Sequence, residues 1–313
     1  MQGVAEDTGW RKAIPQKRDR LQSRVLVGVV GTLLAGLFAY SVFVAYPSAV
    51  SFSSLSTQAI GISLVFALLV KTLRAATPGG AICGGIICFV VTFWTGSLRE
   101  SILRTGLTPL ILLFVLTFAS TRAGRAKKAR TGLAESRRGR STAQVIANLS
   151  VAGLSVSPQL SDLMHRWMAS CCVSGLYDAW IFEIAKVMCL AALVEATADT
   201  VSSEIGQAFG GVPVMLVGMR RVASGTDGAV TLIGSCAGVT AGGLVALAGA
   251  WAMHLNAEAV LIAFGAGICG LFFDSLLGAT VERRGWLGND LVNFTSTLFA
   301  AVLAMIVYRM FVL

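Results

Sequence analysis

Long apolar runs separated by short polar segments dominate the sequence from residue 24 to its C-terminal end. Most of the runs approach the roughly 20 residues that a helix needs to cross a bilayer. They are continuous and rich in Ala, Leu, Val and Gly, whereas the strands of a membrane barrel show a short alternating pattern. Because lipid offers no partner to backbone polar groups, continuous runs of this length indicate helices. The pattern therefore predicts an all-α, polytopic transmembrane helical bundle.

About nine spans are expected, and the range is seven to nine because the fifth run is weakly apolar. The expected spans are Arg24–Tyr46, Leu55–Val70, Ala81–Trp94, Leu107–Ser120, Gln144–Val156, Asp178–Thr197, Ala229–Met253, Glu258–Gly278 and Phe294–Val312. Between the fifth and sixth runs, the mixed segment Ser157–Tyr177 is expected to form an interfacial helix.

Basic residues set the expected orientation. Residues 1–23 form a polar, basic tail, and Lys and Arg beside a span favour the cytoplasmic side. Residues 24–313 are then a single transmembrane domain. Alternation of the spans places the polar loops near residues 122–143, 199–228 and 280–293 in the cytoplasm together with the tail.

The composition agrees with an integral membrane protein. Of 313 residues, 55% are hydrophobic and 13% are charged, and the mean hydropathy is +0.76. Soluble domains carry about 25% charged residues. The net charge of +9 comes from residues beside the apolar runs, which indicates topology signals and contact with anionic membrane lipids, and no nucleic-acid partner.

The positions of the cysteines and histidines argue against a cysteine-based site and against a histidine-based metal site. None of the seven cysteines forms a CxxC pair, and most lie inside apolar runs, so we interpret them as small buried hydrophobic residues. The two histidines are far apart in sequence, which disfavours a histidine-based metal site. The sequence also contains no GxSxG or HExxH motif of a hydrolase.

Three polar segments at the ends of expected spans are candidates for chemistry. In the first, Ala198–Gly206, a helix would place Glu195, Asp199 and Ser202 or Ser203 on one face. Acids at the edge of a span are costly and tend to be functional, and paired carboxylates suit Mg²⁺. Helix capping by Asp199 and the serines is the alternative interpretation.

The second segment, Arg220–Thr231, is rich in glycine. Its glycines would let the backbone approach a phosphate, which the N-terminus of the following helix would also favour, and Arg220 and Arg221 could clamp phosphate oxygens. The Walker A pattern GxxxxGK[ST] is absent. A turn in which Asp227 caps the seventh span is the alternative.

The third segment begins at Asp274, an acid near the end of an apolar span that needs a partner. A metal shared with Asp199 and Asp227 would supply one, and a salt bridge to Arg283 or Arg284 is the alternative. Asn289, Asp290 and Asn293 add polar groups at the same interface.

At these residues the sequence resembles the integral-membrane family that contains transmembrane protein nineteen and the plant phytyl-phosphate kinase. The matching strings, in order, are Arg137–Arg140, Gln144–Asn148, Ala198–Thr200, Ser203–Gly206, Gly225–Gly228, Asp274–Ala279, Trp286–Leu287 and Asn289–Asn293. Two positions depart from the family pattern: Val201 stands where an aromatic residue is common, and Asp227 stands where the family usually has Asn.

The resemblance implies a transferase that phosphorylates an isoprenoid monophosphate with a nucleoside triphosphate. A looser likeness to membrane enzymes that use CTP suggests that donor. The implied catalytic residues are Asp199, Glu204, Asp227 and Asp274, and Mg²⁺ would be held by Asp199, Asp227 and Asp274. The implied phosphate- and substrate-binding residues are Arg137, Arg138, Ser203, Arg221, Gly225, Thr226, Gly228, Asn289 and Asn293.

Three other functions stay open. A lipid cytidylyltransferase would use the same groups but release pyrophosphate. A transporter could use the acids within the spans together with Glu183 and Lys186, although mutual neutralisation of this pair, three residues apart on one helix face, is the simpler interpretation. A scaffold protein would tolerate replacement of the three aspartates.

Overall fold

The computed structural model describes residues 14–45, 53–97, 100–134, 136, 138–169 and 177–312, and these are almost entirely helical. The helices are α1 (Gln16–Tyr40), α3 (Ser53–Thr72), α4 (Pro78–Thr95), α5 (Leu107–Arg122), α6 (Arg125–Arg130), α7 (Thr142–Ser155), α8 (Pro158–Ala169), α9 (Tyr177–Phe209), α10 (Leu232–Met253), α11 (Ala257–Leu277) and α12 (Asn289–Val312). Two π-helical turns, η2 (Ser41–Ala45) and η4 (Gly278–Glu282), continue α1 and α11. Two short strands, β1 (Val214–Met215) and β2 (Ala229–Val230), pair antiparallel.

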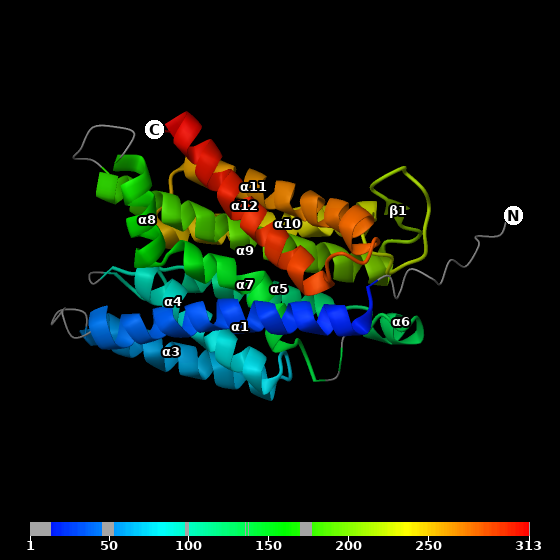
Figure 1. The fold of residues 1–313 in the computed structure, drawn as a ribbon, viewed down its shortest axis with the longest axis horizontal. Helices are drawn as coiled ribbons and strands as arrows, with labels where there is room; N and C mark the ends of the chain where they lie inside the picture. The colour runs from blue at the N-terminus through cyan, green and yellow to red at the C-terminus, as the bar shows by residue number, and fades with distance from the viewer. Residues whose placement is uncertain are drawn as a thin grey trace, which may run out of the picture.

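The all-α bundle is therefore confirmed, and the span count agrees roughly with the prediction. Six helices are long and apolar enough to cross a membrane, namely α1, α3, α4, α10, α11 and α12, and α5 is apolar but shorter. With α7 and α9 they match the nine expected spans. Successive helices run in opposite directions along the long axis, so the polar connections gather at the end that carries α6 and β1 (Figure 1).

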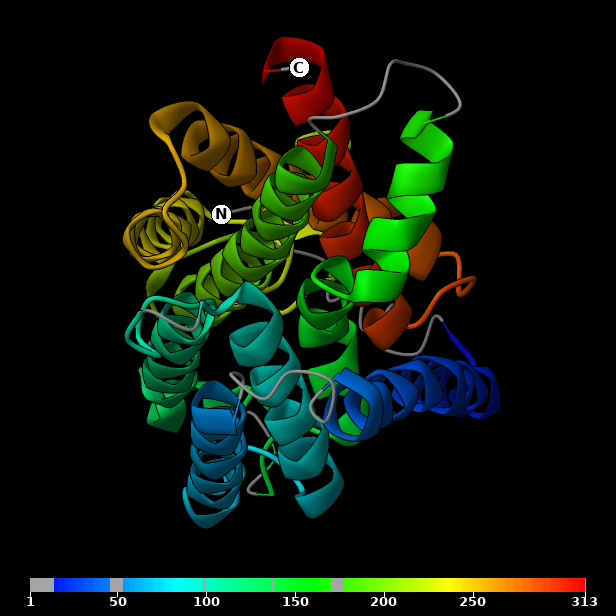
Figure 2. The ribbon, with the colours of Figure 1, turned by 90° about the vertical axis from the view of Figure 1, so that its left-hand side faces the viewer.

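Helix α9 lies at the centre of the bundle, with α10, α11 and α12 on one side and α4, α5 and α7 on the other (Figure 2). Its residues Cys189 to Val194 are each 0% exposed. Glycines on the neighbouring helices allow this close contact: a Cβ atom on Gly249 would lie 2.4 Å from Leu190, and one on Gly267 would lie 2.5 Å from Val194. Small residues let membrane helices approach in this way.

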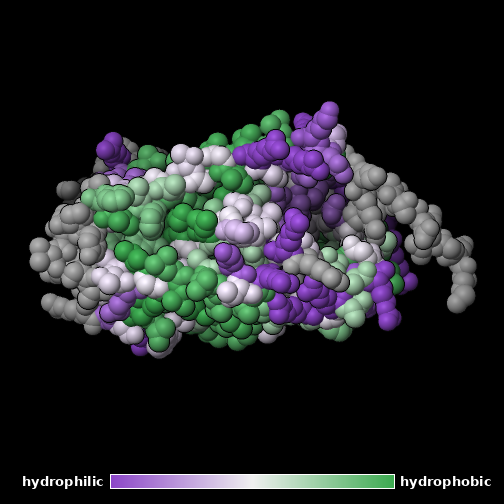
Figure 3. All heavy atoms as spheres, turned by 90° about the horizontal axis from the view of Figure 1, so that it is seen from below, coloured by the Kyte–Doolittle hydropathy of each residue, from purple (hydrophilic) through white to green (hydrophobic). Residues whose placement is uncertain are grey.

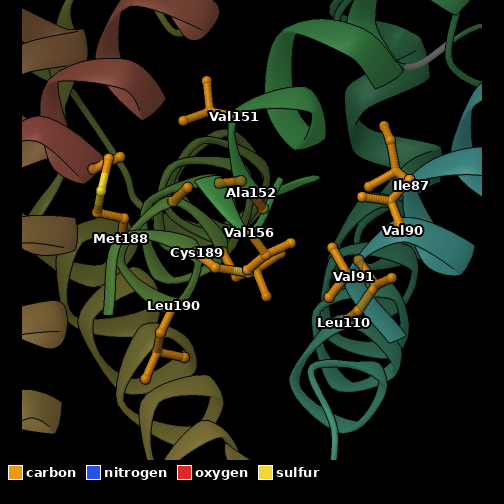
Figure 4. Packing of buried hydrophobic residues seen from close by; sticks show 14 of the residues in the cluster. Ile87, Val90, Val91, Leu110, Val151, Ala152, Val156, Met188, Cys189 and Leu190 are labelled. Carbon is orange, nitrogen blue, oxygen red and sulfur yellow. The ribbon is translucent and has the colours of Figure 1, made fainter. Parts of the chain in front are cut away.

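The packed interior extends from α9 through α7 to α4 and α5. Figure 4 shows Cys189 of α9 near Val156, and Val91 of α4 near Leu110 of α5. Phe38 of α1 packs edge-on against Phe89 of α4, with ring centroids 5.0 Å apart. The free thiols of Cys88 and Cys189 are buried, as expected, whereas Cys236 and Cys269 are exposed, so the interpretation of the cysteines as small buried hydrophobic residues holds only in part.

The outside of the bundle is apolar along its length. Leu33 of α1, Leu64 of α3 and Leu247 of α10 are all more than half exposed, at 55%, 66% and 66%. Figure 3 shows hydrophobic side chains over the body of the molecule and hydrophilic ones gathered toward the end that carries α6 and β1. This distribution suits a body in lipid and one strongly polar end in water.

Helix α7 corresponds to the weak fifth run but is too short to cross a bilayer alone, since 14 residues rise about 21 Å. A capping box starts it, in which Ser141 and Gln144 exchange side-chain-to-backbone hydrogen bonds. Most of its residues are buried by protein. The amphipathic helix α8 follows at the opposite end of the molecule from β1, and it provides the helix expected within Ser157–Tyr177.

Three expected boundaries were wrong. Helix α9 continues to Phe209, so Asp199 lies in a helix and the expected loop from residue 199 begins only at residue 210. Helix α10 begins at Leu232, where Thr231 is the N-cap, so Asp227 does not cap it. Helix α1 begins at Gln16, within the expected tail, because its first turns pack against the segment before α12: Gln22 accepts a hydrogen bond from the Gly288 amide at 2.8 Å.

The charged pair on α9 finds other partners as well. Lys186 donates to the carbonyl of Met253 at 2.9 Å, and its ammonium lies 5.0 Å from the centre of the Phe182 ring. Electrostatic attraction to Glu183 adds to these contacts. The pair therefore ties α9 to the end of α10, which agrees with a structural role.

Candidate functional site

Two acids lie one turn apart on the buried face of α9. Glu195 is 1% exposed, and Asp199 lies further along the same face, as the sequence predicts. Room for Glu195 comes from Gly270 of α11, where a Cβ atom would lie 2.6 Å from Glu195 Cγ. Gly238 of α10 makes similar room, since a Cβ there would lie 2.5 Å from the Ala198 carbonyl oxygen.

Asp274 of α11 faces α12 and α9. The Ser296 hydroxyl lies 3.1 Å from Asp274 Oδ2, within hydrogen-bonding distance. The side-chain amide of Asn293 lies between Asn148 and Asp274. In one orientation its Nδ2 donates to Asn148 Oδ1 at 3.0 Å, and in the orientation turned by 180° its nitrogen donates to Asp274 Oδ2 at 3.3 Å. These groups, and not Arg283 or Arg284, lie within hydrogen-bonding distance of Asp274, so the alternative of a salt bridge to either arginine is not observed.

Asp227 enters the site from the loop between α9 and α10. Burial raises the pKa of its carboxyl to about 6, and the guanidinium of Arg283 opposes this shift. Arg283 also reaches Met215 of β1, with its Nη1 3.9 Å from the sulfur. Arg284 is directed elsewhere, over the ring of Trp286 at 5.5 Å.

The glycines of this loop are required by its backbone. Gly225 and Gly228 have φ angles of +84° and +74°, a region that disfavours side chains. A Cβ on Gly225 would lie 2.2 Å from Leu133, and one on Gly228 would lie 2.1 Å from the Ala279 amide nitrogen. The absence of a side chain at Gly228 thus lets this loop pack directly against η4. This contact brings Asp227 beside the end of α11.

Glu204 lies further along α9 and forms an ion pair with Lys128 of α6. Lys128 is 0% exposed and also donates to the carbonyl of Thr121 at 2.9 Å. The pair fixes the carboxylate that the resemblance assigned to catalysis. Lys128 is a residue that sequence reasoning missed, because it stands within a basic run that looks solvated.

Two further charged residues, which were not among the predicted site residues, also lie at the site. Glu282 ends the π-helical turn η4 and is 8% exposed; its position eight residues after Asp274, about two turns on, was the available signal. Arg140 precedes α7, and its backbone pairs with the segment before α4: its amide donates to Ala75 at 2.9 Å and its carbonyl accepts from Thr77 at 2.9 Å. Its side chain acts electrostatically on Asp199.

Many of these residues line one polar cavity of about 250 Å³ at the end of the bundle that carries β1. The predicted site residues that line it are Asp199, Ser203, Glu204, Gly225, Thr226, Asp227, Gly228, Asp274, Asn289 and Asn293. Arg138 and Arg221 are exposed and do not line it. Arg137 lies outside the described residues.

No group of three Asp, Glu, His or Cys side chains within the described part of the chain is close enough to form a ready-made metal cage. Mg²⁺ is usually held by one or two carboxylates together with substrate phosphates, and it keeps several waters. Asp199, Asp227, Asp274 and Glu282 line the cavity with carboxylate oxygens. These residues thus fit a magnesium ion that arrives with a phosphate ligand better than one bound by the protein alone.

The sequence around this cavity matches a known protein family. A family model described as integral membrane protein DUF92 matches residues 61–301. The chain belongs to this family. All the predicted site residues lie within the matched DUF92 region, whereas α1, which packs against the segment before α12, precedes it. The chain is an integral membrane protein.

Relatives of this DUF92 protein come from an archaeon, a plant and a cyanobacterium. It is 30% identical over 244 residues to uncharacterized membrane protein MJ0933 of Methanocaldococcus jannaschii, covering 78% of this chain and 90% of the relative. It is 28% identical over 200 residues to protein VTE6, chloroplastic, of Arabidopsis thaliana, covering 63% and 56%. It is 25% identical over 221 residues to uncharacterized membrane protein sll0875 of Synechocystis, covering 70% and 76%. No solved structure shows significant similarity to the chain.

Proposed function

We propose that this protein is a membrane-embedded prenyl-phosphate kinase that uses a nucleoside triphosphate, with CTP as the candidate donor. The observation that carries the proposal is the acid-lined cavity, which is lined by acidic residues of α9, the α9–α10 loop, α11 and η4 together with Arg140. The match to VTE6 agrees with the resemblance to the family of the plant phytyl-phosphate kinase.

The residues of the cavity suit the triphosphate of a magnesium–nucleotide complex. Bound magnesium would supply charge neutralisation at the β- and γ-phosphate oxygens. Asp199, Asp227 and Asp274 would hold it, and the Ser296 hydroxyl keeps Asp274 oriented through a contact of 3.1 Å. Glu282, with its buried carboxylate, is a further candidate ligand at the same cavity.

The chemistry requires positioning more than a special nucleophile. An oxygen of the lipid monophosphate, already anionic, attacks the γ-phosphorus, and the bond from that phosphorus to the β,γ-bridging oxygen breaks. A new phosphoanhydride forms and the nucleoside diphosphate leaves, so no general base is needed. Arg140, fixed by backbone hydrogen bonds on both sides, would neutralise charge on the transferred group.

The test is an assay of purified protein in detergent with Mg²⁺, a panel of prenyl monophosphates, and CTP or ATP. We expect mass spectrometry to detect a prenyl diphosphate and a nucleoside diphosphate in equal amounts. Release of pyrophosphate together with a cytidylylated lipid would show that the protein is a lipid cytidylyltransferase and not a kinase. No product with any donor or acceptor, from protein shown to be folded, would overturn both.

Asp199→Asn and Asp162→Asn make a matched pair for this assay. Asp199 lines the cavity, whereas Asp162 is exposed on α8 at the opposite end of the bundle. Both changes replace one carboxylate by an amide of nearly the same shape. Loss of product in the first variant and normal product in the second would assign the activity to this cavity.

A further inference from the structure

A second cavity, of about 100 Å³, opens between α3, α4, α5 and α7. Phe66 of α3 and Phe114 of α5 form its inner wall, with ring centroids 5.4 Å apart in an edge-on arrangement. Phe118 stacks on Phe114 at 5.6 Å. Leu110 and Leu113 add to this apolar lining.

The residues that line this cavity change from apolar to basic along its length. Toward the polar end of the bundle the apolar lining residues give way to the arginines Arg74, Arg122, Arg125 and Arg140. Arg122 is held in place: its Nη2 donates to the Leu73 carbonyl at 3.0 Å, and its guanidinium lies 3.9 Å from the centre of the Phe118 ring. The described residues that line this cavity include no carboxylate.

The two cavities meet at Arg140 and Asn148, which line both of them. On one side of Arg140 the lining is acidic and suits a cation-bound nucleotide. On the other side it is basic and then apolar, which suits an anionic headgroup followed by a hydrocarbon chain. Arginine is favoured for phosphate recognition because its planar fork donates two hydrogen bonds at once.

We infer that the second cavity binds the isoprenoid chain of the lipid monophosphate, with the phosphate at Arg140 and the first isoprene units packed against the wall formed by Phe66 and Phe114. This inference rests on the proposed kinase function. It places the acceptor phosphate where the two cavities join, so that it meets the γ-phosphate of a nucleotide in the polar cavity. The outer faces of α3 and α5, with Leu68 61% and Val115 51% exposed, give the rest of the chain an apolar path into the bilayer.

Gly84 of α4 offers a way to fill this cavity. A Cβ atom there would lie 3.8 Å from Phe66 and 3.9 Å from Val145, which is ordinary contact, so a larger side chain extends into the cavity without backbone strain. Gly80, one turn nearer the polar end, lies beside Arg140, since its Cβ would be 3.2 Å from the Arg140 carbonyl oxygen. A five-carbon chain attached to a phosphate at Arg140 reaches little beyond Gly80, whereas a twenty-carbon chain must pass Gly84.

Gly84→Leu and the control Gly61→Leu are therefore compared with five-carbon and twenty-carbon prenyl monophosphates. Gly61 is exposed on α3, where a Cβ would meet nothing within 4 Å. For Gly84→Leu we expect KM for the long acceptor to rise roughly tenfold or more, as for the loss of about two methylene contacts. KM for the short acceptor and for the nucleotide should stay unchanged, as should all values for Gly61→Leu. An equal effect on both acceptors, or no effect, would overturn the inference.

A binding measurement separates this inference from the kinase proposal. Wild-type protein is irradiated with a twenty-carbon prenyl monophosphate that carries a diazirine on its first isoprene unit, and the labelled peptides are sequenced. We expect labels on the helices that line the cavity, α3, α4, α5 and α7, which excess prenyl monophosphate removes and the prenyl alcohol does not. Such labelling without turnover would support the lipid site and contradict the kinase proposal. Turnover with labels only on helices outside this cavity, or labels displaced equally by the alcohol, would overturn the lipid site.

Discussion

The ammonium group of Lys128, which is fully buried, and the partly exposed carboxylate of Glu204 form an ion pair that ties α6 to the last turns of α9. Lys128 is 0% exposed and Glu204 borders the polar cavity. Removing one member of a buried pair leaves the other charge without compensation, which costs about 3–5 kcal/mol in soluble proteins. The pair therefore gives one carboxylate at the cavity a structural role that can be measured.

Glu204→Gln should lower the thermal stability of the purified protein by several degrees, because it leaves the ammonium of Lys128 buried without a counter-charge. Tm in detergent is the measurement. The double variant Lys128→Met with Glu204→Gln should lose less stability than the sum of the two single changes. Arg130→Met, at an exposed position on the same short helix, is the control and should leave Tm unchanged. Strictly additive losses would mean that the two side chains are not coupled.

Asp274→Asn should weaken the binding of a magnesium–nucleotide complex at least roughly tenfold, because a neutral amide replaces a carboxylate ligand. Binding is measured with Mg²⁺ and again after its removal by a chelator. Wild-type affinity should fall on chelation, whereas the variant should already be weak and change little. Asp162→Asn on α8 is the control. A variant that keeps full, chelator-sensitive affinity would remove Asp274 from the proposed metal site.

Part of this site could be predicted from the sequence because it depends on helical spacing alone. Glu195 and Asp199 share a face of α9 by their separation of one turn. Helices α1, α3, α10, α11 and α12 each contain an apolar stretch of membrane-spanning length, which gives a strong local signal. Helix α7 gave a weaker signal, since protein covers most of its surface and tolerates Asn148 and Ser150 there.

Other features depend on tertiary packing. Arg140 belongs to one of the strings that resemble the family, but its electrostatic effect on Asp199 depends on backbone hydrogen bonds to Ala75 and Thr77 that the sequence does not show. Arg221 follows β1 in a glycine-containing loop that looked suited to phosphate, yet its exposed side chain lies outside the cavity. Spacing within one segment cannot report which side of such a loop faces the neighbouring helices.

Asp227 should give the protein a pH-dependent stability. Burial raises the pKa of its carboxyl from 3.8 to about 6, so the folded protein favours the protonated form. The stability gained from this group is fully present below about pH 3.8 and is lost as pH rises through about 6. Without ligands, Tm of the wild type should therefore fall over this interval relative to Asp227→Asn.

Asp227→Asn is the matched comparison because it keeps the shape of the side chain and removes its titration. Its Tm profile should lack the component between pH 4 and pH 6 that the wild type shows. Since magnesium binds the carboxylate and not the acid, added magnesium–nucleotide should raise wild-type Tm more at pH 7 than at pH 5. Identical profiles for the two proteins would show that Asp227 does not titrate in this range.

Gly228→Ala should displace the loop that carries Asp227. An added Cβ would lie 2.1 Å from the Ala279 amide nitrogen and 2.5 Å from the Ser275 carbonyl oxygen, and neither backbone atom can move without disturbing η4. Gly211→Ala is a close control, since both glycines have φ of +74° but a Cβ at Gly211 meets nothing within 4 Å. Each variant should lose about 1 kcal/mol from the left-handed backbone conformation. Only Gly228→Ala should lose several degrees more in Tm and weaken magnesium–nucleotide binding. Equal losses in the two variants would mean that the close packing of this loop against η4 does not hold the site together.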